Sequence, residues 1–393
     1  MAGKQIQAFF QNLTAQFSPP PVAEPEETLA EVPSGVLKEL RQHMGQLPVP
    51  QPYTIALRDA CTEALKTWRA DPETKNNSLV VLSQPMEAIA PILKASFQED
   101  FPDCDIQFFL SGYQRPNDPL TIIDHLRREL EPEETTTEEA PSAPATEKDI
   151  EETKPTIMVV PDLEQCFLRC IQGWEGIEYL QSLVAHDTAR FWVFGCNFWA
   201  WAFLDKVCQT SAYLEQTFLL PELTGKDLRS WLAKLVDTPL ETDIPECSEL
   251  RVEANDDYWR ALASSAGGFR TTAVHLWLRS LRVQATDLTE EGALAAEVNK
   301  IRLIQAKPER PELMTLEVVD RYLLHSLLIH GEMTRSHLAL SLGEAERTIR
   351  PRVQVLQREG IILQRGRRLS IHPAQYPKLR SEMQNNNFLT GQS

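Results

Sequence analysis

Short apolar runs alternate with longer segments of helical periodicity through the middle of the chain. The apolar runs lie at residues 78–82, 105–110, 156–160, 191–196 and 216–220. Between them, apolar residues recur with helical spacing at residues 86–97, 120–130, 163–185 and 199–207. Apolar runs that alternate with helices are typical of parallel strands covered on both faces. The pattern therefore predicts an α/β fold with a five-stranded parallel sheet and crossover helices.

Helical patterns also flank this region. On its N-terminal side, residues 35–70 contain two helical segments, and prolines between residues 48 and 52 separate them. After Pro221 the strand pattern stops, and residues 225–235 and 257–281 have helical spacing, which Gly267 and Gly268 interrupt. We expect a core domain over residues 35–240 and a helical lid over residues 241–313.

The C-terminal part predicts three helices followed by a β-hairpin. The helical patterns cover residues 316–329, 334–342 and 344–358, and the two short apolar runs of the hairpin are 361–363 and 369–371. Thr334 is a suitable N-cap for the second helix, and Pro351 is expected to kink the third. This order is typical of a winged helix-turn-helix domain, which we expect over residues 314–380, followed by a frayed tail over 381–393.

Composition and charge limit the functions that these elements can serve. The 393 residues carry a formal net charge of -17, so the molecule as a whole does not attract nucleic acid and any such contact must be local. Residues 131–155 are rich in acidic, Thr, Pro and Ala residues and are predicted to form a disordered loop. The seven cysteines show no paired spacing, which argues against a disulfide framework and for a cytoplasmic protein.

The N-terminal 34 residues are predicted to be a flexible tail with one short amphipathic helix at residues 4–17. This helix either docks on its own domain or contacts a partner or a membrane. Elsewhere, Cys166 and Cys170 lie one helical turn apart, but no neighbouring Cys or His pair completes a metal site. HExxH, GxSxG and Rossmann glycine motifs are absent from the sequence, so hydrolase and dehydrogenase functions have no positive support.

Three segments resemble the P-loop ATPases of the AAA+ and STAND type, and the resemblance covers residues 36–282. The segment IMVVPDLEQCFLR resembles a Walker B strand, which implies Asp162 as a magnesium ligand and Glu164 as the residue that polarises water. RFWVFGCNFWAWAFL resembles the next strand with its polar sensor residue, here Asn197. SSAGGFRTTAVHLWLRSL resembles the lid helix that carries a sensor arginine, here Arg270. The resemblance implies ATP and magnesium as ligands.

The phosphate-binding loop of that family has no counterpart in the sequence. A P-loop requires the pattern GxxxxGK[ST], because glycine amides surround the phosphates and the lysine neutralises them. After the first predicted strand the chain instead reads SQPMEAIA, which has no glycine or lysine and adds the negative charge of Glu87. Since phosphoryl transfer depends on positioning and charge stabilisation, we expect ATP hydrolysis to be absent or very slow. An active ATPase with a non-standard nucleotide loop is the alternative.

Each of the four residues that the resemblance singles out also has a purely structural interpretation. Asp162 could cap the helix that follows it, with Glu164 in the first turn of that helix. Asn197 could likewise be a helix N-cap, and Arg270 could be an ordinary surface arginine. The sequence leaves both interpretations open.

The C-terminal segment from residue 344 to residue 372 is the most basic part of the chain, with seven arginines and three acidic residues. The arginines of the third helix and the hairpin that could contact DNA or a protein partner are Arg347, Arg350, Arg352, Arg365, Arg367 and Arg368. A solvated basic face is the alternative. We therefore hypothesise a bacterial regulatory or scaffold protein with an AAA+-like core and a winged helix that binds DNA or a protein partner. A membrane-associated adaptor that uses residues 4–17 is a further alternative.

Overall fold

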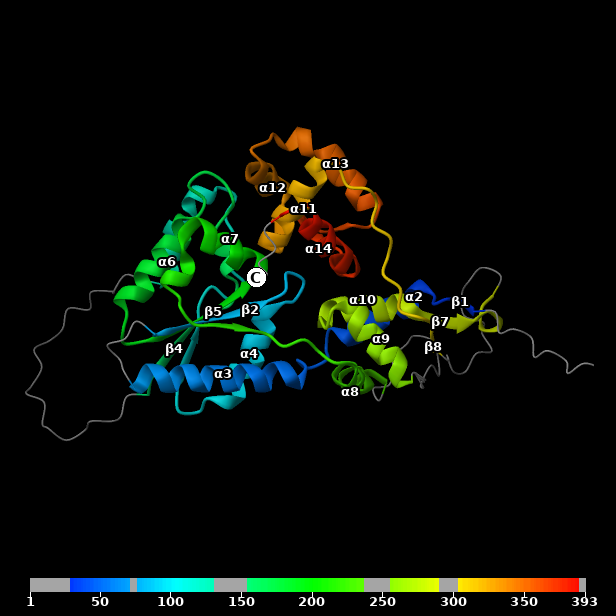
Figure 1. The fold of residues 1–393 in the computed structure, drawn as a ribbon, viewed down its shortest axis with the longest axis horizontal. Helices are drawn as coiled ribbons and strands as arrows, with labels where there is room; N and C mark the ends of the chain where they lie inside the picture. The colour runs from blue at the N-terminus through cyan, green and yellow to red at the C-terminus, as the bar shows by residue number, and fades with distance from the viewer. Residues whose placement is uncertain (1–28, 71–75, 131–153, 237–254, 290–302, 389–393) are drawn as a thin grey trace, which may run out of the picture.

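Figure 1 shows a computed structural model of the chain, in which three parts are arranged around one parallel sheet. The structure describes residues 29–70, 76–130, 154–236, 255–289 and 303–388. The helix predicted at residues 4–17 lies outside the described residues, as does nearly all of the predicted acidic loop. Within the described residues, no helix is both long enough and apolar enough to cross a bilayer.

The central sheet has five strands, all parallel, in the order β3-β4-β5-β2-β6. The strands are β2 (Ser78–Ser83), β3 (Asp105–Phe108), β4 (Thr156–Val160), β5 (Phe191–Asn197) and β6 (Thr217–Leu219). Every residue of β2 and β5 is buried, as two-sided coverage of an apolar strand requires. The prediction of a five-stranded parallel α/β sheet is therefore confirmed.

Helices cover both faces of this sheet and create two apolar cores. The helices of the α/β part are α2 (Ser34–Met44), α3 (Gln51–Ala70), α4 (Ile89–Asp100), α5 (Ile122–Leu130), α6 (Glu175–His186) and α7 (Phe198–Cys208). Val81 and Val193 share one core with α2, α3 and α4, whereas Val80 and Phe194 share the other with α5, α6 and α7. Successive strand residues point to opposite faces, so each apolar run supplies both cores.

The single helix predicted over residues 163–185 is wrong, because the chain turns in its middle. Residues Leu163–Cys166 form a short 3-10 helix, and α6 begins only at Glu175. Between them, the Leu168 amide donates to the Gly173 carbonyl across 2.7 Å and closes a tight loop. A Cβ atom at Gly173 would lie 2.1 Å from the Leu168 carbonyl oxygen, so only glycine fits there.

The region after the core contains three helices and a small antiparallel sheet. The helices are α8 (Gly225–Val236), α9 (Asp256–Ala266) and α10 (Arg270–Ser280), and the sheet has the order β1-β7-β8, formed by Leu29–Glu31, Leu281–Gln284 and Ile304–Gln305. The prediction that strands stop after Pro221 is therefore wrong, and three residues of the predicted N-terminal tail form a strand. These strands pair across more than half of the chain, a contact that local periodicity does not reveal.

The C-terminal module, defined here as residues 316–388, lies above the carboxyl end of the parallel sheet (Figure 1). Its first elements are α11 (Val318–His330), β9 (Glu332–Thr334), α12 (Arg335–Leu342), α13 (Glu346–Arg358), β10 (Ile362–Arg365) and β11 (Arg368–Ile371). The three predicted helices and the hairpin are present, and β9 adds a third strand in the order β10-β11-β9. The Thr334 hydroxyl accepts the His337 amide and caps α12, as predicted.

Two details of the C-terminal module differ from expectation or extend it. The helix α13 runs from Glu346 to Arg358 and contains Pro351, and the kink expected there stays a prediction. The tail expected after residue 380 starts later, because α14 (Tyr376–Asn385) continues past that point. Met383 is fully buried in the core that α11 and α13 also share, and this burial holds the last turns of α14 in place.

Candidate functional site

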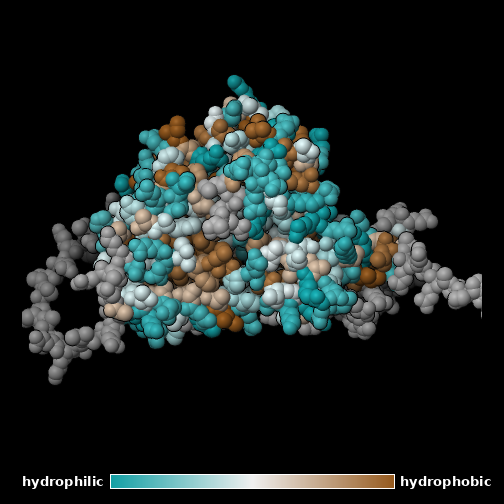
Figure 2. Space-filling view, in the orientation of Figure 1, coloured by the Kyte–Doolittle hydropathy of each residue, from teal (hydrophilic) through white to brown (hydrophobic). Residues whose placement is uncertain are grey.

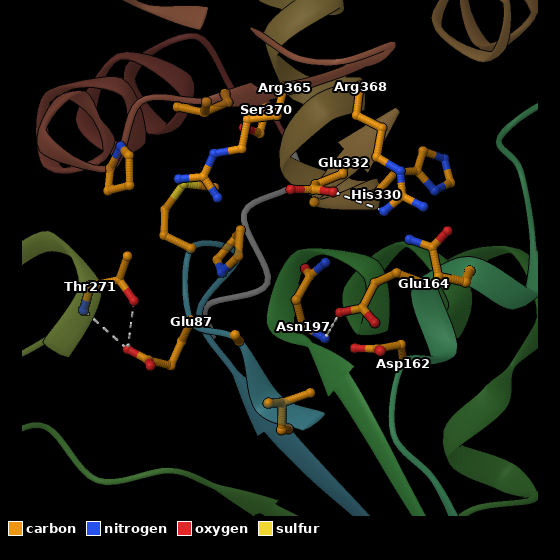
Figure 3. Close-up of a pocket in the computed structure, with 18 of the residues that line it drawn as sticks. Glu87, Asp162, Glu164, Asn197, Thr271, His330, Glu332, Arg365, Arg368 and Ser370 are labelled. Carbon is orange, nitrogen blue, oxygen red and sulfur yellow. Dashed lines mark hydrogen bonds and ion pairs between the residues drawn. The ribbon is translucent and has the colours of Figure 1, made fainter. Parts of the chain in front are cut away.

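A cleft opens between the carboxyl ends of the parallel strands, the helix α10 and the hairpin β10–β11 (Figure 3). Its volume is about 440 Å³. The loops that follow β2, β4 and β5 form its floor, because parallel strands end at the same edge of a sheet. The structure thus brings together Asp162, Glu164 and Asn197, the three residues that the Walker B and sensor resemblance selected.

The loop after β2 contains an internal ion pair where the family has its phosphate loop. Glu87, 7% exposed, pairs with the Arg270 guanidinium, and the Thr271 amide and hydroxyl donate to its second oxygen across 3.3 and 3.4 Å. Burial raises the pKa of Glu87, and the Arg270 charge opposes that rise. Arg270 is a largely buried partner of Glu87, so the interpretation of Arg270 as a surface arginine is wrong.

The two carboxyl groups that follow β4 lie in different surroundings. Asp162 lines the cleft, and its side chain makes no capping hydrogen bond to the 3-10 helix, so the helix-cap interpretation is wrong for this residue. Glu164 is buried and its carboxylate accepts the Asn197 amide. Burial, and then the nearby Asp162 charge, raises the pKa of Glu164 to about 8. Glu164 therefore ties the 3-10 helix to the end of β5.

Asn197 uses its whole side chain for structural contacts. Its Oδ1 atom accepts the amides of Trp199 and Ala200, both across 2.9 Å, which caps α7. Its Nδ2 atom donates to the Ile329 carbonyl of α11 across 2.8 Å. The N-cap interpretation is confirmed, and the same side chain also joins the core to the C-terminal module.

Further polar contacts, which the sequence did not indicate, hold the C-terminal module on the core. The Arg115 side chain is fully buried by its neighbours and donates to the Phe167 carbonyl across 2.6 Å, while its Nη2 lies 3.1 Å from His330 Nδ1. The Arg169 amide donates to His330 Nε2 across 3.2 Å. Burial, followed by the Arg115 charge, lowers the pKa of His330 and keeps the ring neutral.

Tyr376 of α14 makes a second connection between the C-terminal module and the core. Its hydroxyl donates to Gln84 Oε1 across 2.6 Å and accepts the Trp199 indole N–H across 3.0 Å. Gln84 belongs to the loop that replaces the phosphate loop, so this loop contacts α14 directly. Sequence reasoning did not indicate Arg115, His330 or Tyr376, because each is a lone polar residue in a helix or turn, without a motif around it.

The six arginines predicted to contact DNA or a partner do not share one surface. Arg352 forms ion pairs with Asp320 and Glu317, and Arg368 pairs with Glu332 across 3.0 Å. Arg365 lines the cleft, on the side opposite the strand ends in Figure 3, and Arg367 is exposed at the adjacent turn. A second cavity of about 370 Å³ lies beside the first, and all three hairpin arginines line it. Arg347 and Arg350 are exposed on α13.

The floor of the cleft does not fit ATP and magnesium. The loop after β2 offers a buried carboxylate that is already paired, whereas a phosphate needs amides and a cation there. The side chain of Asn197 is also occupied on both of its polar atoms.

Comparison with known proteins gives structural matches only. No family model matches the sequence, and no curated protein matches it. The RuvB Holliday junction branch migration motor of Thermotoga maritima is 13% identical with a TM-score of 0.31, over 82% of this chain and 94% of that chain. Cdc6p of Pyrobaculum aerophilum is 12% identical with a TM-score of 0.35, over 91% and 99%. Orc1 of Aeropyrum pernix, solved in complex with DNA, is 12% identical with a TM-score of 0.34, over 87% and 94%.

The core of this chain is an α/β fold with a five-stranded parallel sheet. At such identities and TM-scores the likeness carries nothing about activity or partners. The strand order and the contacts of this chain alone define its fold and its cleft.

Proposed function

We propose that this protein is a regulatory scaffold, in which an AAA+-like core that does not turn over nucleotide holds a C-terminal winged helix in a fixed orientation for binding DNA. The ion pair between Glu87 and Arg270 carries the first part of this proposal. A sensor arginine acts by contacting a phosphate, and here a protein carboxylate compensates its charge instead.

Contacts between the core and the C-terminal module support the scaffold role. Asn197 reaches α11, Tyr376 reaches the loop after β2, and His337 of α12 lies 2.8 Å from the Pro116 carbonyl through its Nε2 atom. Three separate helices of the module are thus attached to the core by buried or partly buried hydrogen bonds. Such contacts fix the direction in which the exposed face of the module points.

The exposed face of α13 supports the binding of DNA. Ile349, Val353 and Leu356 are buried on one side of this helix, and Arg347 and Arg350 are exposed on the other. In the described residues, neither arginine forms an ion pair or a side-chain hydrogen bond. Unpaired arginines on one face of a helix are suited to phosphate contacts.

An ATP-binding measurement tests the core. We expect no saturable binding of a fluorescent ATP analogue with magnesium, and no turnover approaching roughly 1 per second, which is the low end for kinases. Turnover at that rate, abolished by Glu164→Gln, would establish the active ATPase instead and would contradict this part of the proposal.

A salt titration tests the C-terminal module. Fluorescence anisotropy of a labelled duplex with the full chain should show affinity that falls with salt, and R347A/R350A should flatten the slope of log K against log salt by about two. The matched control is R127A/R128A, which removes the same charge from the exposed side of α5 in the core. An equal effect of both variants, or no binding at low ionic strength, contradicts DNA contact through α13.

A protein partner is the second candidate function, and one surface favours it. Val318, Val319 and Tyr322 are 62%, 50% and 46% exposed on the first turns of α11. The face of the molecule in Figure 2 is mostly polar, and apolar atoms reach the surface at its upper edge, where the C-terminal module lies. If the duplex does not bind, a variant with Val318→Ser and Tyr322→Ser tests this surface in the same full chain, by loss of a copurifying protein that the wild-type chain retains.

A further inference from the structure

His275 and Arg365 line one edge of the cleft, His372 contacts His275, and Arg41 and Arg279 lie close enough to act on these rings. We call these five basic side chains the basic rim. They come from three separate parts of the chain: Arg41 in the last turn of α2, His275 and Arg279 on α10, Arg365 on β10, and His372 just after β11. The imidazole rings of His275 and His372 meet edge to face, with centroids 5.0 Å apart and an angle of 74° between their planes. The rim thus spans the boundary between α10 and the C-terminal module.

The described part of the chain does not neutralise the charge of the rim. Arg41, Arg279 and Arg365 form no ion pair within the described residues. Among the described residues, the charges that lower the pKa of the two rings are positive: Arg41, Arg365 and His372 act on His275, and Arg41 and Arg279 act on His372. Burial, followed by these charges, lowers the pKa of His275 to about 4, and burial is also the main cause that lowers the pKa of His372.

Two other arginines near the cleft, unlike those of the rim, are paired with carboxylates. Glu87 compensates Arg270, and Glu332 compensates Arg368, although both arginines lie close to the same cavity. These two arginines are thus compensated by carboxylates, whereas the arginines of the rim form no ion pair within the described residues. Like charges held together without a counter-ion repel each other, so the arrangement gains stability when an anion binds between them.

The hydrogen-bonding groups of the rim point to the chemistry of this anion. His372 Nδ1 accepts the Ala374 amide across 3.2 Å, so the neutral ring carries its proton on Nε2 and can donate it. The guanidinium groups of Arg41, Arg279 and Arg365 each carry several N–H donors in a planar fork. A carboxylate offers two oxygens, whereas a phosphate group offers at least three and can accept from all three segments.

We propose that Arg41, His275, Arg279, Arg365 and His372 bind a phosphate group between the helix α10 and the C-terminal module. Arg365 and His275 line the cleft itself, so the ligand sits at the mouth of the cavity. Since α2, α10 and β10 each contribute a cation, the bound phosphate joins the module to the rest of the molecule. The phosphate belongs either to a small free polyphosphate or to the backbone of a nucleic acid.

Titration of the full chain with inorganic tripolyphosphate at low ionic strength tests the proposal. We expect calorimetric binding and a rise in melting temperature, which sodium chloride at the same ionic strength does not reproduce. R279Q/R365Q removes two rim cations and should weaken binding by about tenfold or more. The matched control R127Q/R128Q removes two exposed arginines from α5 and should bind tripolyphosphate as the wild type does.

A second arm with a labelled duplex identifies the source of the phosphate. If R279Q/R365Q loses both tripolyphosphate and duplex, the rim binds backbone phosphate; if it loses only tripolyphosphate, the rim binds a small free ligand. Tripolyphosphate binding that persists where duplex binding fails supports the rim and contradicts only the DNA function. Should the double variant melt earlier than the wild type without ligand, R279Q and R365Q are titrated singly.

Two results would overturn the phosphate site. One is the absence of any tripolyphosphate-dependent heat or stabilisation in the wild type at low ionic strength. The other is an equal loss of affinity in R127Q/R128Q, since that would make the interaction a general effect of surface charge.

Discussion

The floor and the rim of the cleft contain the same kinds of charged groups, but the chain uses them differently. On the floor, Glu87 is paired with Arg270, Glu164 accepts a backbone amide, and Asn197 satisfies two helices. On the rim, Arg41 and Arg279 are exposed and form no ion pair within the described residues. Charged side chains that pair with each other stabilise the fold, whereas charged side chains without a partner are available to bind a ligand. Substitutions on the floor should therefore change stability, and substitutions on the rim should change binding.

The largest effect is expected where one charge of the floor loses its partner. Arg270→Met leaves Glu87 buried without a counter-charge and should lower the free energy of unfolding by about 3 to 5 kcal/mol. The control is the double variant E87Q/R270M, which removes both charges and should recover most of that loss. Urea unfolding of the two variants measures the difference. Equal stability of the single and double variants would show that the pair is not a buried structural ion pair.

A smaller loss is expected at Asn197, which serves two helices. Asn197→Ala removes the cap of α7 and the donor to the buried Ile329 carbonyl, and should cost about 2 to 4 kcal/mol. Asn197→Ser keeps a capping oxygen and loses only the donor, so it should fall between the alanine variant and the wild type. If serine restores full stability in the same urea titration, the contact with α11 contributes nothing and only the cap matters.

Acidification should lower the free energy of unfolding through His275 of the rim. Because the folded pKa of His275 is about 4 and lies below the ordinary histidine value, the unfolded chain binds more protons as the pH falls below about 6.5. Stability attributable to His275 is thus lost on acidification, by about 1 to 2 kcal/mol between pH 7 and pH 5. His275→Asn should reduce this loss, and His186→Asn, on exposed α6, should not. Identical pH dependence in wild type and His275→Asn would contradict the prediction.

The smallest effect on stability is expected for a single rim arginine. Arg365→Ala removes an exposed side chain that forms no ion pair in the described part of the chain, so stability should change by less than about 0.5 kcal/mol. Because the substitution relieves repulsion within the rim, a slight gain in stability is favoured. Differential scanning calorimetry without any phosphate present measures it. A loss comparable to that of Arg270→Met would mean that Arg365 belongs to the structural charges of the floor.

Much of the fold could be predicted from periodicity, because burial on two faces makes the signal local. The strands β2, β4 and β5 are short apolar runs in the sequence, and each is a central strand in the structure. The small sheet of β1, β7 and β8 was missed, since two- to four-residue strands that pair across most of the chain have no local signature. The break between residues 166 and 175 was missed for another reason: Phe167, Leu168 and Ile171, which lie in the loop, follow helical spacing in the sequence.

The candidate site could be predicted only in part. The resemblance to a Walker B strand and a sensor strand indicated Asp162, Glu164 and Asn197, and these residues do line one cleft. The partner of Arg270 could not be predicted, because nothing in the sequence relates a glutamate at position 87 to an arginine at position 270. The basic rim was equally hidden, since its five members are spread from residue 41 to residue 372 and none belongs to a motif.

The sequence by itself determined the parallel α/β sheet, the helices after it and the hairpin at the end, because each depends on the periodic burial of neighbouring apolar residues. It also determined that the glycine and lysine of a phosphate loop are missing after β2. Only the tertiary structure decided which charges meet. Ion pairs and hydrogen bonds act over a few ångströms in space, and the packing of α10 and the C-terminal module against the sheet sets those distances.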